Sequence, residues 1–442
     1  MNHEILNPES SATFLNDASA LHQALVDQMK QSGVIQSPQV EAAFIAVPRH
    51  LFLPDVQIDQ VYRDDAVVTK KQGESPLSSS TMPTLMALML EQLRLEPGHR
   101  VLEIGAGTGY NAALMAYLVG EAGKVTTIDI DEDIVATARG HLAAAGFERV
   151  KAICGDGGYG YAECAPFDRI ILTAGVSDIA PAWREQLHQS GRMIVPLAFL
   201  PGGGQRIIIF EFSDQCLASV STITGGFMPL RGEFSMVPLG DGRRVQIGPE
   251  PGLQLQLRNG DQREIDPEAI YQLLTGPKQD RPTGIRVTSH ELGTRYSLWS
   301  ALLDYSQEYQ EYRSLGCGIS AEGEKTNQGI VPYLVGFPGK YCSTGGLLKE
   351  GSLAVYFRPS DDTLPLPWPK DKHPFELWVR SYGPDDTLAN DLVDHIRGWD
   401  AAGRPIDEAK WRFRAYRPET EYVPSTNEIV IDLRSSRLVI DW

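Results

Sequence analysis

The stretch VLEIGAGTGY, Val101 to Tyr110, decides the fold of this chain. Its apolar first half is typical of a buried strand, and the apolar run from Gly109 to Val119 that follows is typical of a helix. Glycine lacks Cβ, so the backbone at Gly105 and Gly107 can take positive φ and lie close to a ligand. The stretch therefore predicts a strand, a tight turn and a helix of a doubly wound α/β sheet, with a ligand at the carboxyl edge of the sheet.

The glycine spacing indicates which ligand binds there. A dinucleotide turn has the pattern Gly-x-Gly-x-x-Gly, whereas Gly105, Gly107 and Gly109 form Gly-x-Gly-x-Gly with Glu103 just before them. The carboxylate of Glu103 would repel a pyrophosphate, but it suits the cationic sulfonium and amino groups of S-adenosylmethionine. We therefore predict S-adenosylmethionine as the cofactor, with a nicotinamide or other nucleotide as the alternative.

Two further acidic residues follow predicted strands. Asp129 ends the strand that begins at Lys124, where its carboxylate can accept both ribose hydroxyls. Asp156 and Gly157 follow the strand over 149–154, where Asp156 can accept a hydrogen bond from the adenine amine. Taken singly, Asp129 could be a helix N-cap and Asp156 a turn residue, and dinucleotide enzymes also place an acid at the first position. Together the three strand ends predict an adenosine site.

Motifs along residues 40–232 carry a family resemblance. They are VPRHLFLP (47–54), VLEIGAGTGYNAA (101–113), GDGGYG (155–160), APFDRIILTA (165–174), QLHQSGRMIVPL (186–197) and FMPLRG (227–232). In this order they resemble the protein L-isoaspartyl O-methyltransferase family. The resemblance implies a Rossmann-like, S-adenosylmethionine-dependent carboxyl O-methyltransferase that esterifies aspartyl or isoaspartyl side chains of a protein or peptide. Such an ester closes to a succinimide, which serves protein repair or peptide modification.

The same resemblance indicates the catalytic loop. Aligning the family's Thr-Ile-Ser-Gln-Pro-like loop on Pro83 places Thr81 at the position of the catalytic serine, with Ser80 beside it. Met82 departs from the family pattern, which bears on acceptor specificity. Without the resemblance, the hydroxyls of residues 78–81 are equally typical of caps for a helix over Pro83 to Leu93.

Three segments are expected: an N-terminal helical and acceptor-loop segment (1–83), a methyltransferase core (84–235) and a C-terminal α+β extension (236–442). Helices are predicted over 18–30 and 37–46, with 54–80 irregular. Core strands are predicted over 100–104, 125–129, 150–153, 167–173, 192–196, 205–212 and 217–222, the last two forming a final antiparallel pair.

The extension has a helix–strand pattern without a catalytic motif. Helices are predicted over 267–274, 297–312 and 386–399, and strands or apolar runs over 330–337, 353–357, 375–379 and 411–416. The extension resembles that of longer family members that modify peptides. An alternative function for the whole chain is a cofactor-binding module with weak catalysis, whose C-terminal part recognises a partner peptide.

Composition limits the remaining function classes. The 442 residues carry a formal net charge of −17, which opposes binding to nucleic acid. No apolar stretch is long enough to span a bilayer, and the first residues lack a secretory pattern, so we expect a cytoplasmic protein. The five cysteines form no C-x-x-C pair and the histidines show no metal-binding spacing, so no metal site is predicted. The oligomeric state has no signal in the sequence.

Overall fold

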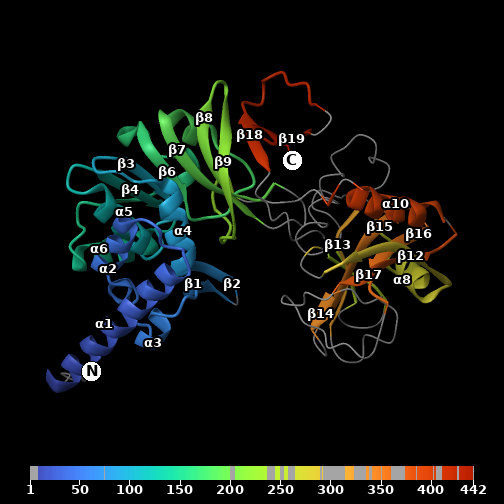
Figure 1. The fold of residues 1–442 in the computed structure, drawn as a ribbon, viewed down its shortest axis with the longest axis horizontal. Helices are drawn as coiled ribbons and strands as arrows, with labels where there is room; N and C mark the ends of the chain where they lie inside the picture. Colours follow the sequence, from blue (N-terminus) through green and yellow to red (C-terminus); the bar gives the residue numbers. More distant parts are fainter. Residues whose placement is uncertain are drawn as a thin grey trace.

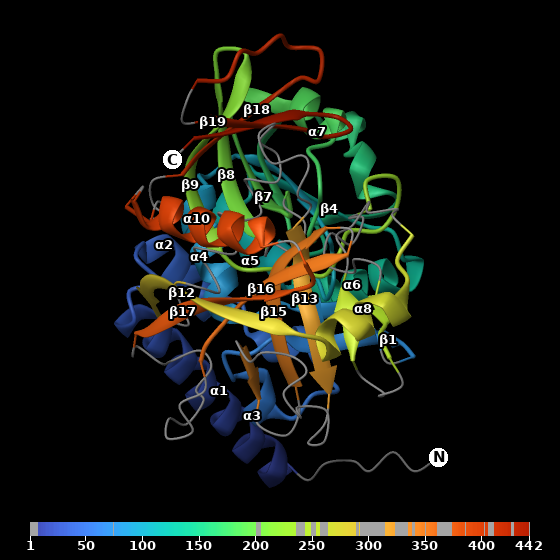
Figure 2. The ribbon, with the colours of Figure 1, turned by 90° about the vertical axis from the view of Figure 1, so that its right-hand side faces the viewer.

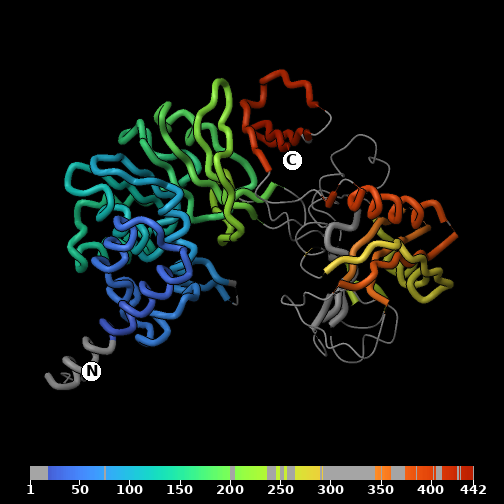
Figure 3. Tube along the Cα trace, in the orientation of Figure 1, coloured from blue at the N-terminus to red at the C-terminus, as the bar shows by residue number. Residues whose placement is uncertain are grey.

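The structure is a computed structural model, coloured along the chain in Figure 3. It describes residues 8–73, 75–199, 205–235, 244–248, 253–256, 264–288, 291, 314–322, 335–337, 341–349, 351–359, 374–384, 386–401, 403–404, 411–425 and 428–441. Figure 1 shows two bodies, one around a ten-stranded sheet and one around an eight-stranded sheet.

The ten-stranded sheet has the order β19-β20-β18-β9-β8-β7-β6-β3-β4-β5. The strands from β7 to β5 are parallel, and those from β7 to β19 are antiparallel. The core strands are β3 (Arg100–Ile104), β4 (Lys124–Asp129), β5 (Lys151–Cys154), β6 (Phe167–Leu172), β7 (Leu187–Leu197), β8 (Arg206–Ser213) and β9 (Cys216–Thr224). The predicted doubly wound α/β core is confirmed, and each strand lies where the apolar pattern indicated it.

Alternating side chains of this sheet enter two separate apolar cores. Val101, Ile171 and Ile209 belong to one core, whereas their neighbours Leu102 and Ile170 belong to the other. Both faces are buried, which is why the parallel strands read as continuous apolar runs rather than as alternating patterns.

Helices from two parts of the chain cover the first core. It contains side chains from α1 (Pro8–Gln31), α2 (Pro38–Ala46), α4 (Pro83–Leu93), α5 (Tyr110–Val119) and α6 (Glu132–Ala144). The second core includes α7 (Pro181–Gln186). The helices predicted over 83–93 and from Gly109 therefore form as expected, and α2 starts behind its Ser37 cap.

The segment before α4 is more regular than predicted. Residues 54–80 were expected to be irregular, but they form α3 (Ile58–Val61) and an antiparallel hairpin of β1 (Val67–Gln72) and β2 (Ser75–Ser80). The prediction was wrong because VVTKKQ and SPLSSS have no apolar alternation. Two-stranded pairing through the backbone needs no such pattern.

The eight-stranded sheet has the order β10-β11-β13-β15-β16-β17-β12, with β14 paired to β15. Its strands are β10 (Arg244–Gln246), β11 (Gln254–Gln256), β12 (Lys278–Val287), β13 (Ser314–Glu322), β14 (Val335–Phe337), β15 (Tyr341–Lys349), β16 (Ser352–Phe357) and β17 (Phe375–Tyr382). The predicted helices over 267–274 and 386–399 appear as α8 (Pro267–Thr275) and α10 (Thr387–Ala401), and α10 packs on this sheet (Figures 1 and 2). The helix predicted over 297–312 lies outside the described residues.

The last strands of the chain return to the first sheet. β18 (Arg412–Tyr416) pairs with β9, and β20 (Arg437–Asp441) and β19 (Glu428–Asp432) follow it outward (Figure 1). The final antiparallel pair expected from the sequence is therefore extended by three strands. The boundary placed between 235 and 236 stays a prediction, while residues 412–441 add strands to the sheet of the core.

Candidate active site

The glycine turn after β3 has the backbone conformation that the sequence predicted. Gly105 and Gly107 have φ of +106° and +52°. A Cβ at Gly105 would collide with the Thr173 side chain, and one at Gly107 would lie 3.5 Å from the carbonyl oxygen of Ser79. Gly109 is the N-cap residue of α5 and lies against α6, where a Cβ would come within 3.3 Å of a backbone oxygen. Gly105 and Gly107 thus shape a hollow, whereas Gly109 allows two helices to approach.

Glu103 lines this hollow and is buried. Its two carboxylate oxygens accept hydrogen bonds from Asn111 Nδ2 at 2.7 Å and from Thr127 Oγ1 at 2.6 Å. Burial raises the pKa of Glu103 to about 7, and the two hydrogen bonds oppose that rise. The site therefore holds a carboxyl group that titrates close to neutrality and favours a cation beside it.

Asp129 stands at the end of the neighbouring strand β4. Its carboxylate accepts hydrogen bonds from the backbone N–H groups of Gly107 and Asp131, both at 3.3 Å. Burial raises its pKa, and the Arg231 guanidinium, 3.8 Å away, opposes that rise. Arg231 itself donates to Asp131 at 2.8 Å, so this cation is already engaged by an acid.

Asp156 and Gly157 occupy the loop after β5, but in different ways. Gly157 lines the cavity described below, and its carbonyl accepts a hydrogen bond from Trp183 Nε1 at 2.8 Å. Asp156 accepts hydrogen bonds from the backbone N–H groups of Gly158, at 2.8 Å, and Glu233, at 2.7 Å. Neither Asp156 nor Gly109 is among the described residues that line this cavity.

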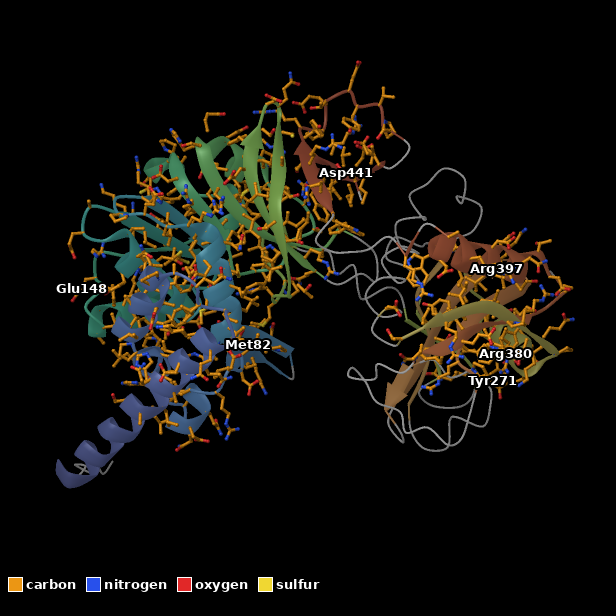
Figure 4. The ribbon with its side chains drawn as sticks, viewed as in Figure 1. Met82, Glu148, Tyr271, Arg380, Arg397 and Asp441 are labelled. Carbon is orange, nitrogen blue, oxygen red and sulfur yellow. The ribbon has the colours of Figure 1, made fainter. Side chains whose placement is uncertain are left out.

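Ser80 ends β2, Thr81 follows it before α4, and both border the same cavity. The Ser80 hydroxyl is buried and accepts from the Arg49 guanidinium at 3.5 Å. The Thr81 hydroxyl makes no hydrogen bond within the described part of the chain. Met82, labelled in Figure 4, follows them and precedes α4.

The hydroxyls of residues 78–81 do not cap α4, which corrects the alternative drawn from the sequence. The N-cap position, Met82, makes no side-chain cap hydrogen bond. Asp64 instead accepts from the backbone N–H of Thr84 at 2.8 Å and from its hydroxyl at 2.6 Å. Because a carboxylate from another segment satisfies the helix start, Thr81 is left available to the cavity.

Arg49 is a buried cation that the sequence analysis did not single out. Its guanidinium donates to the backbone carbonyls of Val61, Arg63 and Asp65, at 2.8 to 3.2 Å, and to that of Thr81 at 3.1 Å. One side chain thus ties the end of α3 and the residues between α3 and β1 to the end of β2. Its place within the VPRHLFLP motif, an arginine among apolar residues, was the available signal.

These elements enclose a cavity of about 720 Å³. One wall comes from residues 224–231 at and after the end of β9, which include most of the FMPLRG motif. Gln205 holds this wall through hydrogen bonds with both backbone groups of Phe227, at 2.7 and 2.8 Å. The lining residues are Ala66, 77–82, Leu85, Met86, 103–108, Tyr110, Asn111, 128–130, Gly157, Thr173, Ala174 and 224–231.

The cavity therefore joins two groups of residues that the sequence had placed in separate motifs. Glu103, Asp129 and the glycine turn line it, and so do residues 79–82. Residues 20–233 match the family model described as Protein-L-isoaspartate(D-aspartate) O-methyltransferase (PCMT). The chain is also 35% identical over 221 residues to Protein-L-isoaspartate O-methyltransferase 2 of Archaeoglobus fulgidus, covering 49% of this chain and 96% of that protein.

This chain belongs to the protein-L-isoaspartate O-methyltransferase family. It is 40% identical over 190 residues to the Protein-L-isoaspartate O-methyltransferase of Thermotoga maritima, a match over 43% of this chain and 59% of that protein's length. A solved structure named protein-L-isoaspartate O-methyltransferase is similar with a TM-score of 0.48 and 24% identity, covering 89% of this chain and 96% of that one.

The cofactor of this family member is S-adenosylmethionine. The residues present fit it, because the cavity combines two carboxylates with a glycine turn whose backbone a side chain would otherwise cover. The basic side chain in the lining, Arg231, is paired with Asp131. Within the described ranges, the structure has no helix that is both long and apolar enough to cross a membrane.

Proposed function

We propose that the protein transfers a methyl group from S-adenosylmethionine to the side-chain carboxylate of an isoaspartyl residue in a protein or peptide. One observation carries this proposal. The same cavity is lined by the glycine turn with Glu103 and Asp129 and by the loop that carries the hydroxyls of residues 78–81. Such a cavity can hold a cationic donor at one end and an acceptor carboxylate at the other. Family membership supports the isoaspartyl group as the acceptor.

At the donor end we assign roles to Glu103, Gly105, Gly107, Asp129 and Gly157. Asp129 would accept from the ribose hydroxyls, and Glu103 would attract the cationic methionine portion. The glycines would lie against the ligand through bare backbone. When bound, S-adenosylmethionine supplies an electrophilic methyl group on a sulfonium sulfur, which leaves as a neutral thioether.

Asp156 and Gly109 do not line the cavity, but they shape segments that do. Both oxygens of Asp156 already accept backbone N–H groups, so we assign it the shaping of the loop that presents Gly157. Its predicted hydrogen bond with the adenine amine stays a prediction, since a carboxylate can accept further donors. Gly109 allows α5 to start close to α6.

At the acceptor end the protein has to position and desolvate a group that is already a nucleophile. In the reaction a carboxylate oxygen forms a bond to the methyl carbon while the carbon–sulfur bond breaks, and no proton is transferred. The Thr81 hydroxyl would donate a hydrogen bond that orients the acceptor carboxylate. The Ser80 hydroxyl already accepts a hydrogen bond from Arg49. Met82, Leu85 and Phe227 provide apolar surface that excludes water from the acceptor.

The proposal is tested with purified protein, methyl-labelled S-adenosylmethionine and a peptide containing one isoaspartyl residue. We expect base-labile label on this peptide, and much less on the same peptide with an aspartyl residue. Equal labelling of an aspartyl site in one particular peptide would favour dedicated peptide modification over repair. Cofactor binding without label on either peptide would contradict the proposal and leave the binding-module alternative. We also propose that the protein acts in the cytoplasm.

A further inference from the structure

The turn between β19 and β20 contacts two segments that border the cofactor end of the cavity. This turn, residues 433–436, lies near the C-terminus, in the strands that extend the sheet beyond β9. Its polar contacts on the methyltransferase core are made by Arg434, Ser435 and Ser436. They reach the loop after β6 and the segment after Arg231.

The first set of contacts converges on Asp178. This buried carboxylate accepts from the Ser435 backbone N–H and the Ser436 hydroxyl, both at 2.5 Å, and from the Ile179 backbone N–H at 2.7 Å. Ser436 is itself fully buried. Two of the three donors to a buried carboxylate thus come from the distant C-terminal turn, and removing one would leave that charge poorly solvated.

The loop that carries Asp178 also builds the cavity wall. It begins with Thr173 and Ala174, which line the cavity. The next residue, Gly175, donates to the Met228 carbonyl and accepts from the Leu230 N–H, both at 2.8 Å. Fixing Asp178 therefore fixes the stretch that holds residues 228–230 against the cavity.

The second set of contacts runs through Arg434. Its guanidinium forms an ion pair with Glu233, two residues after Arg231. The Glu233 backbone N–H donates to Asp156 at 2.7 Å, and Asp156 in turn accepts from Gly158. Arg434 is thereby linked to the loop that presents Gly157.

An aromatic contact reinforces this link. The Arg434 guanidinium lies 5.7 Å from the centre of the Phe234 ring, and that ring packs on Trp183 with centroids 6.2 Å apart. Trp183 donates from its indole N–H to the Gly157 carbonyl at 2.8 Å. A Cβ on Gly158 would collide with Phe234, so the ring lies directly against this loop.

We propose that Arg434, Ser435 and Ser436 are positioning residues for cofactor binding. They hold two walls of the donor end, the stretch from Thr173 to Asp178 and the Asp156–Gly158 loop, without contacting the cavity themselves. The inference rests on the proposed function in one respect, namely that this end of the cavity binds S-adenosylmethionine. It gives the C-terminal strands a role in the core's ligand affinity.

The test compares Ser436→Ala, Arg434→Ala and Arg434→Lys in the full chain. Calorimetry measures the Kd for S-adenosylhomocysteine, and kinetics measure KM for each substrate together with kcat. We expect Ser436→Ala to raise the Kd about 10-fold, as the loss of a buried hydrogen bond to a charge implies. Arg434→Ala, at a more exposed ion pair, should raise it about 3-fold, and Arg434→Lys should recover part of the loss.

The kinetic pattern separates positioning from a merely structural role. KM for S-adenosylmethionine should rise with the Kd, while KM for the peptide and kcat at saturating cofactor stay within about 2-fold. The matched control is Asp432→Asn, which removes an exposed 2.5 Å ion pair with Arg437 in the same hairpin and should leave the Kd unchanged.

Two results would overturn the inference. One is an unchanged Kd in both Ser436→Ala and Arg434→Ala. The other is a rise in Kd that is no larger in these variants than in the control Asp432→Asn. If Ser436→Ala fails to fold, the two Arg434 variants decide the question. A wild-type chain that does not bind S-adenosylhomocysteine would instead contradict the proposed function.

Discussion

Thr81 and Ser80 are adjacent hydroxyls with different surroundings. Arg49 holds the Ser80 hydroxyl at 3.5 Å, whereas the Thr81 hydroxyl borders the cavity and makes no hydrogen bond within the described residues. If Thr81 orients the acceptor carboxylate, the hydroxyl matters more than the methyl group. The loop can therefore use a threonine in the place that the family resemblance gives to a serine.

The Thr81 variants test that role. Thr81→Ala should lower kcat/KM for an isoaspartyl peptide by about 10-fold or more, because a charge-assisted hydrogen bond is lost, while Thr81→Ser should stay within about 3-fold. Thr69→Ala is the control, since its hydroxyl donates to Ser78 in the same hairpin and Thr69 does not border the cavity. Equal losses in the two Thr81 variants would contradict a role for the hydroxyl.

Glu103 makes stability depend on pH. Burial raises its pKa from 4.5 to about 7, so the folded state binds a proton that the unfolded state releases. Its contribution to stability is fully present below about pH 4.5 and is lost as the pH rises through about 7. Glu103→Gln removes this titration while keeping the size of the side chain.

The melting temperature (Tm) of both proteins, measured without cofactor from pH 5 to pH 8, checks this prediction. The wild type should lose stability relative to Glu103→Gln as the pH rises. A difference in Tm that stays constant across this range would show that Glu103 does not titrate there. A cationic ligand should favour the ionised form, so S-adenosylmethionine binding near pH 6.5 should release protons to the buffer.

At the scale of elements, the start of α4 depends on a carboxylate from outside the helix. Asp64 caps it through the backbone N–H and hydroxyl of Thr84. This arrangement fixes the point where Thr81 and Met82 lead into the helix. The position of the acceptor loop is thus set jointly by Asp64 and by Arg49, which binds the carbonyl of Thr81.

Asp64→Ala should lower the free energy of unfolding by about 1 to 2 kcal/mol, the usual effect of losing a helix cap. Asp59→Ala removes an exposed ion pair with Arg63 at 2.8 Å and should cost less than about 0.5 kcal/mol. Urea denaturation of the two variants and the wild type measures both values. The cap assignment fails if the Asp64 variant is no less stable than the Asp59 variant.

At the scale of the whole molecule, the C-terminal strands are part of the body around the ten-stranded sheet. Phe413 of β18 is buried and packs edge-on against Phe199, with ring centroids 5.2 Å apart. The same apolar core contains Leu102 and Ile104 of the central strand β3. Figure 4 shows the end of these strands at Asp441, beside the first body.

Phe413→Ala should therefore destabilise the methyltransferase core by about 3 to 5 kcal/mol, through lost burial and the cavity it leaves. Thermal unfolding with and without S-adenosylhomocysteine identifies the core transition, because ligand binding shifts only the unfolding of the body that holds the ligand. Val423→Ala, at a side chain that is 90% exposed, is the control. An unchanged core transition in Phe413→Ala would show that the core folds independently of these strands.

Much of the core could be predicted because its information is local. The parallel strands are short apolar runs bounded by turns, the glycine turn carries its conformation in its own residues, and Glu103 and Asp129 follow from their places at strand ends. A buried parallel strand needs little more than apolar side chains to be recognised. The sequence by itself therefore determined the fold class, and it named Glu103, Asp129 and the glycines at 105 and 107 that line the cavity.

The tertiary structure alone decided the rest. The Arg49 contacts, the Asp64 cap and the return of β18 to β9 depend on contacts between separate segments of the chain, and the β1–β2 hairpin, although local, is held by backbone pairing. Backbone pairing and buried hydrogen bonds leave no periodic pattern, because any polar residue of suitable reach can satisfy them. The family resemblance had named Thr81 and Ser80, but the contacts that hold their loop and those of the C-terminal turn became visible only in three dimensions.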